Sequence, residues 1–444
     1  MKPVPSPKKA VFAAICLAAV CGLIFCFAGV DQTRRENGFA QPDDFFISTQ
    51  KMLADYDFMW AALEDQFPFF DEASQNGFFE SRNIDKSEVR DKYRRMITEV
   101  TSSQDKDPYE KPDTSVPVLY PNLYSDSKNA MNTIFALAID SFQNLGHLRT
   151  LTIEYYKAET DTAEPFPDKT HAFYQLLAEN SPDEQTDTHY DPDDYFYLEY
   201  ADGVPKITIT SFESGGSDEN LQKAIKTVSG ICDKAMESDD IIIDIRGNGG
   251  GNSYIWQKGL ARLFYDRQKP FVSLGGFKAG CLDYFGEHAS QNGCTLYPVN
   301  PQDPSLLYPD ERVNETMRRA GLDYIIETTV NGIIPKPEGS SYDGDIWLLV
   351  DGQCASSSEM LALFCKNTGA ATIVGTKTRG LSSIGFSPIF KSLYLPESGL
   401  CIQFEWIAYL NPDLTFNNFT GTAPDIETES DALEVCLEQI RKEA

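Results

Sequence analysis

The chain has 444 residues, of which 67 are acidic and 38 basic, so its formal net charge is −29. This charge argues against a nucleic-acid-binding protein, because such binding depends on Lys and Arg neutralising phosphates, and against adhesion to anionic lipid. The length exceeds the common single-domain size of about 100–150 residues, so two or three structural units are expected.

The N-terminus differs in composition from the rest of the chain. Lys2, Lys8 and Lys9 precede an uncharged run, Ala10–Val30. A positive head before an apolar stretch is typical of an export signal, and the run has the length of about 20 residues that a membrane-spanning helix needs. We expect 1–30 to be a signal anchor or signal peptide, with the uncleaved anchor favoured, and 31–47 to be a linker. The rest of the chain would then be extracytoplasmic, either anchored in the cell membrane or secreted.

Residues 48–145 are predicted to form an N-terminal helical subdomain. Apolar residues recur there at helical spacing, beginning with Leu53, Tyr56, Met59, Trp60 and Leu63. Further helices are predicted at Val89–Val100 and Ala130–Phe142. The stretch between them, Thr101–Asp126, is rich in Pro and Asp and is predicted to be a loop.

An α/β pattern begins after this helical part. The expected order is a strand, an irregular acidic stretch, a strand and a helix, at Leu148–Glu154, Glu159–Asp194, Lys206–Thr210 and Asp218–Glu237. A fully apolar strand, Ile241–Ile245, then runs through a Gly-rich turn into a helix at Tyr254–Tyr265. Strand, turn and helix in this order are typical of a crossover unit in a parallel sheet.

The remaining predicted elements complete an α/β core at 146–430, interrupted by an insertion at about 269–343. They are strands at Ile346–Val350 and Ala371–Val374, a helix from Ser356 to about Lys366, and late strands at Leu393–Leu395 and Leu400–Trp406. A C-terminal helix is predicted within 431–444.

The segment Val350–Glu359 takes an apolar strand through a tight turn into a helix that starts on serines. A nucleophile placed there would be exposed at the carboxyl edge of the sheet, where α/β proteins place their sites. The free N–H groups that follow could hold an oxyanion. The structural alternative is a capping box, in which Ser356 and Glu359 satisfy the helix start.

The turn Gly249–Gly251 follows a buried strand and offers further N–H donors. A plain strand-to-helix turn is the alternative. The turn lacks the Lys-Ser/Thr of a P-loop and the spacing of a dinucleotide fingerprint. Asp244 and Arg246 beside it are expected to brace the turn by pairing.

A serine hydroxyl needs a base to take its proton, and histidine is scarce in this chain. His147 lies between a predicted helix and strand, where a side chain can face a cleft, whereas the other three lie in irregular or loop sequence: His171, His189 and His288. We therefore favour His147 as the base.

Seven cysteines lie outside the apolar N-terminal run. Cys281 and Cys294 flank a polar, Gly-bearing loop and are the one predicted disulfide. No CxxC or Cys/His zinc spacing occurs, and neither a metal nor an organic cofactor is expected.

Several blocks together resemble one family. Ile243–Gly251 is similar to a hydrophobic-D-x-R-x-N-x-G-G block, Ala355–Glu359 to an A-S-A-S-E nucleophile segment, and Gly421–Ile426 to a terminal G-V-x-P-D block. Gly369–Thr378 and Asp57–Phe70 match further family segments. The chain thus resembles the serine peptidases that comprise C-terminal (tail-specific) processing proteases and tricorn core proteases. This resemblance implies a crossover-connected, ClpP/crotonase-like α/β catalytic core with an N-terminal helical subdomain.

The resemblance also implies roles for individual residues. Ser356 would be the nucleophile, and the N–H groups of Ser357 and Gly250 would form the oxyanion hole. The tail-specific branch uses a Lys base, but Leu381 stands at that position. Gly146-His147-Leu148 instead matches the G-H segment of the tricorn-like, Ser–His branch.

The residue that orients the base is left open by the sequence. Where the tricorn core has a Glu shortly before its G-V-x-P-D block, this chain has Asn418. An Asn can hold an imidazole by a hydrogen bond but cannot offset its positive charge. Glu405 and Asp140 are the other candidates, and the sequence does not rank them.

The expected function is that of an extracytoplasmic serine-type endopeptidase acting on peptide or protein substrates. His147 would deprotonate Ser356, which then forms an acyl-enzyme. Two alternatives remain: a weakly active or inactive family member that binds peptides or other ligands, and a small-molecule esterase or amidase.

Overall fold

The computed structural model describes residues 48–102, 127–142, 145–153, 156, 166–180 and 190–443. The predicted signal segment 1–30, the linker 31–47 and most of the predicted loop 101–126 lie outside these ranges. Within them, no helix has both the length and the apolar character to cross a bilayer.

The N-terminal helices form as predicted and pack around aromatic side chains. They are α2 (Thr49–Gln66), α3 (Phe69–Gln75), α4 (Phe78–Ser81), α5 (Lys86–Ser102) and α6 (Ser127–Asp140). Ser48 caps α2 by accepting from the Lys51 N–H. The apolar stripe of α2 is buried, and Trp60 stacks on Phe70 with 6.2 Å between ring centroids.

Two predictions that follow this helical part are corrected. The strand expected at Leu148–Glu154 is shorter within the described residues 148–153. Arg149–Thr150 form β1 and pair with β11 (Cys401–Glu405), and the Leu151 N–H makes one further bond to the Cys401 oxygen at 2.9 Å. The acidic stretch Glu159–Asp194 is not irregular throughout, since it contains α8 (Asp168–Asn180). Phe173, Tyr174 and Leu177 are buried on one face of α8, so a helical apolar stripe was present within the acidic sequence.

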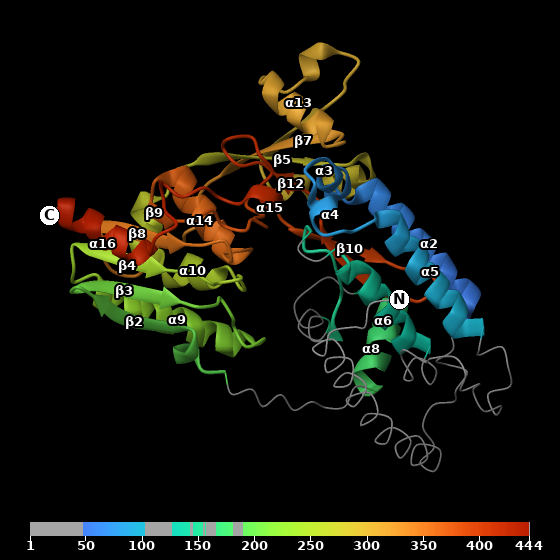
Figure 1. The fold of residues 1–444 in the computed structure, drawn as a ribbon, viewed down its shortest axis with the longest axis horizontal. Coiled ribbons are helices and arrows are strands. Elements are labelled where there is room, and N and C mark those ends of the chain that lie inside the picture. The colour runs from blue at the N-terminus through green and yellow to red at the C-terminus, as the bar shows by residue number, and fades with distance from the viewer. Residues whose placement is uncertain are drawn as a thin grey trace, which may run out of the picture.

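A six-stranded sheet forms the part of the molecule at the left of Figure 1. Its strands are β2 (Phe196–Ala201), β3 (Val204–Ile209), β4 (Asp240–Asp244), β8 (Asp345–Val350), β9 (Thr372–Gly375) and β13 (Ile426–Glu427). Their spatial order is β13-β9-β8-β4-β3-β2, and only the edge strand β2 is antiparallel to its neighbour. This is the crossover-connected α/β sheet expected from the sequence.

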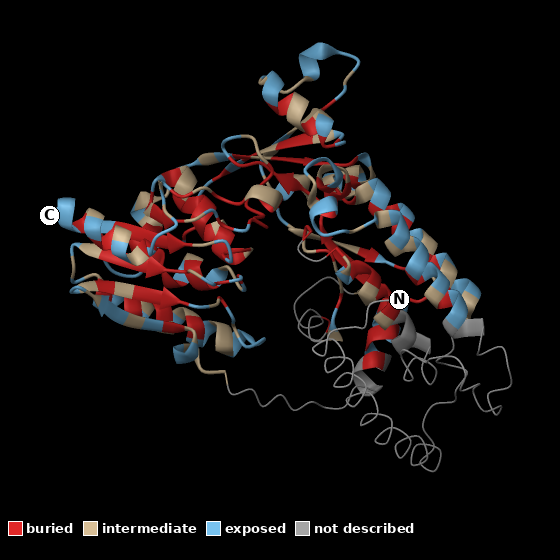
Figure 2. Ribbon diagram, viewed as in Figure 1, coloured by how far each residue is buried: buried red, intermediate tan, exposed pale blue. Residues whose placement is uncertain are grey.

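Both faces of this sheet are covered, which explains why its central strands are apolar throughout. Ile241 and Ile243 face one core, built with helices that include α9 (Asp218–Ala235), α10 (Tyr254–Gly259), α11 (Ala261–Phe264) and α14 (Ser357–Thr368). Ile242 faces the opposite side and packs with α16 (Ala432–Glu443). Successive side chains of a strand alternate between faces, so both sets must be apolar. Figure 2 shows these strands as a continuous buried layer.

The helix expected at Tyr254–Tyr265 is interrupted. It ends as α10 at Gly259, and Leu260 leaves the helical conformation before α11 begins. A Cβ on Gly259 would lie 2.8 Å from Val228 of α9. The close approach of α10 to α9 therefore needs glycine at this point, and glycine weakens the helix.

The predicted insertion at 269–343 supplies three of the four strands of a second sheet. Strands β5 (Phe271–Phe277), β6 (Cys294–Pro298) and β7 (Tyr324–Val330) pair antiparallel, and β5 also pairs with β12 (Ala408–Tyr409) from the core. Helices α12 (Leu282–His288) and α13 (Glu311–Arg319) belong to the same segment. This sheet lies between the six-stranded sheet and the N-terminal helices (Figure 1).

The predicted disulfide between Cys281 and Cys294 is wrong, because both residues are free thiols. The Cys281 thiol is buried and donates to the backbone oxygen of Gln66 at 3.5 Å. Cys294 begins β6 instead of closing a loop.

The late strands occur where they were expected. β10 (Phe390–Tyr394) and β11 pair antiparallel, and with β1 they form a three-stranded sheet in the order β1-β11-β10. A short helix, α15 (Asn417–Thr420), follows β12.

Candidate active site

Ser356 lies at the junction of β8 and α14, beyond the carboxyl end of the sheet. Its backbone has φ 55° and ψ −117°, and its side chain makes no capping hydrogen bond. The capping box that was the structural alternative is therefore absent. A non-glycine residue in this conformation is costly and is held only where its surroundings require it. The Ser356 N–H donates to the Gly380 oxygen at 3.1 Å, which is one such constraint.

The Gly-rich turn after β4 lies directly against Ser356. The Ala355 N–H donates to the Asn248 oxygen at 3.3 Å, and Asp351 accepts from the Gly247 N–H at 3.0 Å. Gly250 has φ 111°, and a Cβ there would lie 2.8 Å from the Ser356 Cβ. The two segments singled out in the sequence are thus in contact.

Asp244 and Arg246 pair as expected. The Arg246 guanidinium contacts both oxygens of Asp244, at 2.9 and 2.7 Å, and also reaches Asp431 at 3.0 Å. Their role is to tie the turn to the sheet and to the start of α16.

His147 lies in the connection between α6 and β1, and its side chain reaches Ser356. The His147 Nε2 is 3.1 Å from the Ser356 Oγ. Both Gly146 and His147 have positive φ, 52° and 46°. His147 also packs edge-on against Phe390, with 5.6 Å between ring centroids. A hydrogen bond of this length is what a Ser–His proton transfer needs.

Glu405, at the end of β11, stands behind the imidazole. Its Oε1 lies 3.1 Å from the His147 Nδ1, and only 2% of the residue is exposed. The contact meets the distance of an ion pair but not the alignment of a hydrogen bond. In enzymes, hydrogen bonds between an imidazole and its orienting acid are often long or poorly aligned before substrate binds. The same carboxylate oxygen accepts a hydrogen bond from the buried Ser383 hydroxyl.

The other two candidates for the orienting residue lie elsewhere. Asn418 makes no hydrogen bond to the imidazole: its Nδ2 has no partner among the described residues, and its Oδ1 accepts from the Gly146 N–H at 3.0 Å. It therefore fixes the backbone that carries His147. Asp140 is exposed at the end of α6.

The two proposed oxyanion donors differ in their hydrogen bonding. The Gly250 N–H donates to the Asn248 Oδ1 at 2.8 Å. The Ser357 N–H is the first of α14, where backbone donors have no partner within the helix, and no acceptor for it occurs in the described parts of the chain.

A buried carboxylate lies next to the turn that carries Ser356. Glu359, in the first turn of α14, is fully buried and accepts from Asn417 at 2.6 Å and from the Thr422 hydroxyl at 2.5 Å. Burial raises the pKa of Glu359 to about 7. Glu359 therefore connects the first turn of α14 to Asn417 and Thr422. This role differs from that of a capping box.

Sequence reasoning missed Ser383 and the Gly380 carbonyl. Ser383 belongs to no motif, and Gly380 was noticed only as the neighbour of Leu381 in the segment compared with the family's Lys base. Only the fold brings these two residues to Glu405 and Ser356. Leu381, between them, is buried with φ 70°. Among the described residues, no cluster of three His, Cys, Asp or Glu side chains could hold a metal ion.

Comparison with known proteins shows the family to which the chain belongs. Residues 203–428, just over half of the chain, match the sequence pattern of peptidase family S41. No curated protein matches the sequence significantly.

Solved structures with related chain paths share little sequence with this protein. A protein of Parabacteroides merdae ATCC 43184, described as a peptidase, is 14% identical, with 89% of this chain and 97% of that chain covered and a TM-score of 0.44. A lipoprotein from Streptococcus agalactiae is 15% identical, with 72% and 84% covered and a TM-score of 0.40. The photosystem II D1 C-terminal processing protease is 17% identical, with 54% and 45% covered and a TM-score of 0.30. On the strength of the match over 203–428, the chain belongs to peptidase family S41.

Proposed function

We propose that this S41 chain is an endopeptidase that cleaves peptide bonds through an acyl-enzyme on Ser356, with His147 as general base. The observation that carries the proposal is the 3.1 Å separation between the Ser356 Oγ and the His147 Nε2. The buried Glu405 carboxylate at Nδ1 supports it, since an acid there stabilises the imidazolium that forms.

The proposed reaction follows from these positions. His147 Nε2 takes the Oγ proton as Ser356 attacks the scissile carbonyl carbon, giving a tetrahedral oxyanion. The imidazolium then protonates the leaving amine as the C–N bond breaks, which leaves an ester on Ser356. A water molecule, deprotonated by the same His147, attacks the ester, and the serine leaves as the proton returns.

Oxyanion stabilisation is proposed to come from the Ser357 and Gly250 N–H groups, each worth about 3–4 kcal/mol. Ser357 is free to donate. Gly250 must release or share its hydrogen bond to the Asn248 Oδ1. This bond is the one observation that favours the second candidate, a weakly active member that holds peptides in the same cleft.

A fluorophosphonate probe tests the proposal, because it reacts only with an activated serine. Labelling is expected in the wild type and should disappear in Ser356→Ala and in His147→Ala. Ser358→Ala is the matched control, since its hydroxyl is buried nearby with no hydrogen-bond partner among the described residues. A folded wild type that resists the probe would favour the binding module, and a panel of peptide and ester substrates separates the endopeptidase from an esterase or amidase.

We also infer from residues 1–30 that the catalytic part acts outside the cytoplasm, on a membrane anchor or after secretion. Two measurements on expressing cells would test this: fractionation, which locates the chain, and addition of a protease to intact cells, which digests only chain that lies outside the cytoplasm. Catalytic chain that remains in the cytoplasmic fraction contradicts it.

A further inference from the structure

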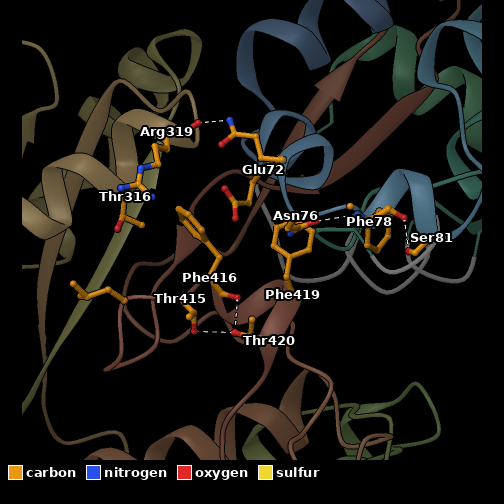
Figure 3. A pocket seen from close by; sticks show the side chains of 13 residues that line it. Glu72, Asn76, Phe78, Ser81, Thr316, Arg319, Thr415, Phe416, Phe419 and Thr420 are labelled. Atoms are coloured by element: carbon orange, nitrogen blue, oxygen red, sulfur yellow. Dashed lines mark hydrogen bonds between the residues drawn. The ribbon is translucent and has the colours of Figure 1, made fainter.

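An open cavity of about 650 Å³ lies between the N-terminal helices, α13 and the segment that carries α15. Figure 3 shows this cavity, and neither Ser356 nor His147 is among the residues that line it. Its size falls in the range of about 300–1,000 Å³ that is usual for ligand sites. Its apolar walls are Phe78, Leu414, Phe416 and Phe419.

Glu72 is the one unpaired charge on this wall. It is half-buried on α3, and the described residues supply no hydrogen bond or ion pair to its carboxylate. Burial raises the pKa of Glu72 above its ordinary value. Figure 3 shows the carboxylate turned toward the space that Phe416 and Phe419 also face. The cation in the lining, Arg319, is already paired with Glu315 at 3.0 Å.

The cavity wall and the catalytic loops share α15. Phe419 packs on Phe69 with 6.3 Å between ring centroids, and a Cβ on Gly146 would collide with the same Phe69 ring. The neighbouring Asn418 accepts from the Gly146 N–H. One side of α15 therefore lines the cavity while the other holds the residue before His147.

A second connection runs from α15 to the nucleophile. Asn417 donates to Glu359 at 2.6 Å and accepts from the Ser382 N–H at 2.8 Å. Gly380 lies against the Asn417 backbone and accepts from the Ser356 N–H. A change in the position of α15 would thus be felt at both His147 and Ser356.

We propose that this cavity binds a peptide segment that carries a Lys or Arg side chain beside an apolar side chain, and that its occupancy is coupled through α15 to the Ser356 site. The aromatic walls would take the apolar side chain, and Glu72 would take the cation. The chain's net charge of −29 favours the approach of a cationic segment. The coupling half of the proposal rests on the proposed function, and the binding half does not.

Binding is tested with a fluorescein-labelled, C-terminally amidated hexapeptide of alternating Phe and Lys, followed by fluorescence anisotropy. All proteins carry Ser356→Ala, so the peptide stays intact. Adding Glu72→Gln should weaken binding about five-fold, as expected for one partly desolvated charge pair. Glu438→Gln, an exposed change on α16, is the matched control and should leave binding unchanged.

Charge reversal separates binding from misfolding. Glu72→Lys should lose the Phe–Lys peptide and gain affinity for the Phe–Glu analogue. Two results would overturn the site. One is that the protein with Glu72 and the Glu72→Gln variant bind the Phe–Lys peptide with equal affinity. The other is that the protein with Glu72 binds the Phe–Lys and Phe–Glu peptides equally well.

Coupling is read from the rate of fluorophosphonate labelling with Ser356 intact. Unlabelled Phe–Lys peptide should change this rate about five-fold or more at saturation, and Glu72→Gln should need about five times the wild-type peptide concentration to reach half of the change. An equal half-maximal concentration in both proteins would mean that the peptide competes at Ser356 itself, and no change in either would remove the coupling. If no protein labels, the proposed function fails while the anisotropy result still decides the binding site.

Discussion

The proposed nucleophile and its proposed base come from two regions that are built in different ways. Ser356 and the Gly-rich turn follow adjacent parallel strands, β8 and β4, whose carboxyl ends meet by topology. His147 and Glu405 come from the region of N-terminal helices and antiparallel strands, and backbone contacts between distant segments hold them, such as the Glu405 N–H to the Gly146 oxygen at 2.8 Å. The first region is specified by local sequence, whereas the second depends on long-range packing.

The largest effect is expected from the base region. Glu405→Gln keeps the shape of the side chain but removes the charge that would stabilise the imidazolium, so kcat should fall about 10³-fold. Asp140→Asn, at the exposed alternative, should leave kcat unchanged. Steady-state kinetics on a peptide substrate, with folding checked by circular dichroism, would measure both. A small loss in Glu405→Gln together with a large loss in Asp140→Asn would reverse the assignment.

The nucleophile region can be tested with two adjacent glycines. Gly250→Ala forces a Cβ to 2.8 Å from both the Ala355 oxygen and the Ser356 Cβ, at φ 111°. It should lower the free energy of unfolding by about 3 kcal/mol and reduce activity. A Cβ on Gly249 would meet nothing within 4 Å, so Gly249→Ala should be close to neutral. Urea unfolding measures the free energy of unfolding of both variants. Equal destabilisation by the two substitutions would contradict the contact between Gly250 and Ser356.

Glu359 offers a pH-dependent test of the same region. Its pKa is raised from 4.5 to about 7, so the folded state holds the proton more tightly than the unfolded state does. Its stabilising contribution is complete below pH 4.5 and is lost as the pH rises to about 7, by about 3 kcal/mol at 1.4 kcal/mol per pKa unit. Glu359→Gln removes this titration. The free energy of unfolding of the wild type minus that of the variant should therefore fall between pH 4.5 and 7, and a difference that is flat or rises with pH would contradict the raised pKa.

The smallest effect is expected at Asn418. Asn418→Ala leaves the buried Gly146 N–H without its acceptor, at a cost of about 1–2 kcal/mol in the free energy of unfolding. Because Gly146 precedes His147, activity should also fall, by about ten-fold. Asn418→Asp retains an acceptor oxygen and should recover part of the stability. An activity loss as large as that of Glu405→Gln would mean that Asn418 acts on the imidazole itself.

Much of the nucleophile region was predictable because its signals are local. An apolar strand that is buried on both faces, a glycine turn and a serine at a helix start all lie within short stretches, 241–251 and 346–359. The same local logic predicted the N-terminal helices and the strands β10 and β11. It failed for α8, where acidic residues obscured a helical stripe, and for the Cys281–Cys294 pair, where the distance between two thiols depends on packing.

The sequence by itself therefore determined the α/β class, the family, and the two segments that meet at Ser356. Strand periodicity and turn propensity depend on residues that are close in the chain, so they can be recognised without the fold. Only the tertiary structure decided which acid stands behind His147. The sequence placed Asn418 at the family's position and left Glu405 and Asp140 as unranked alternatives. The three are separated when β11 pairs with β1, which brings Glu405 to the imidazole, leaves Asn418 on the Gly146 backbone and leaves Asp140 exposed. Contacts between residues more than 250 positions apart leave no local pattern, because their cause is the packing of the whole chain.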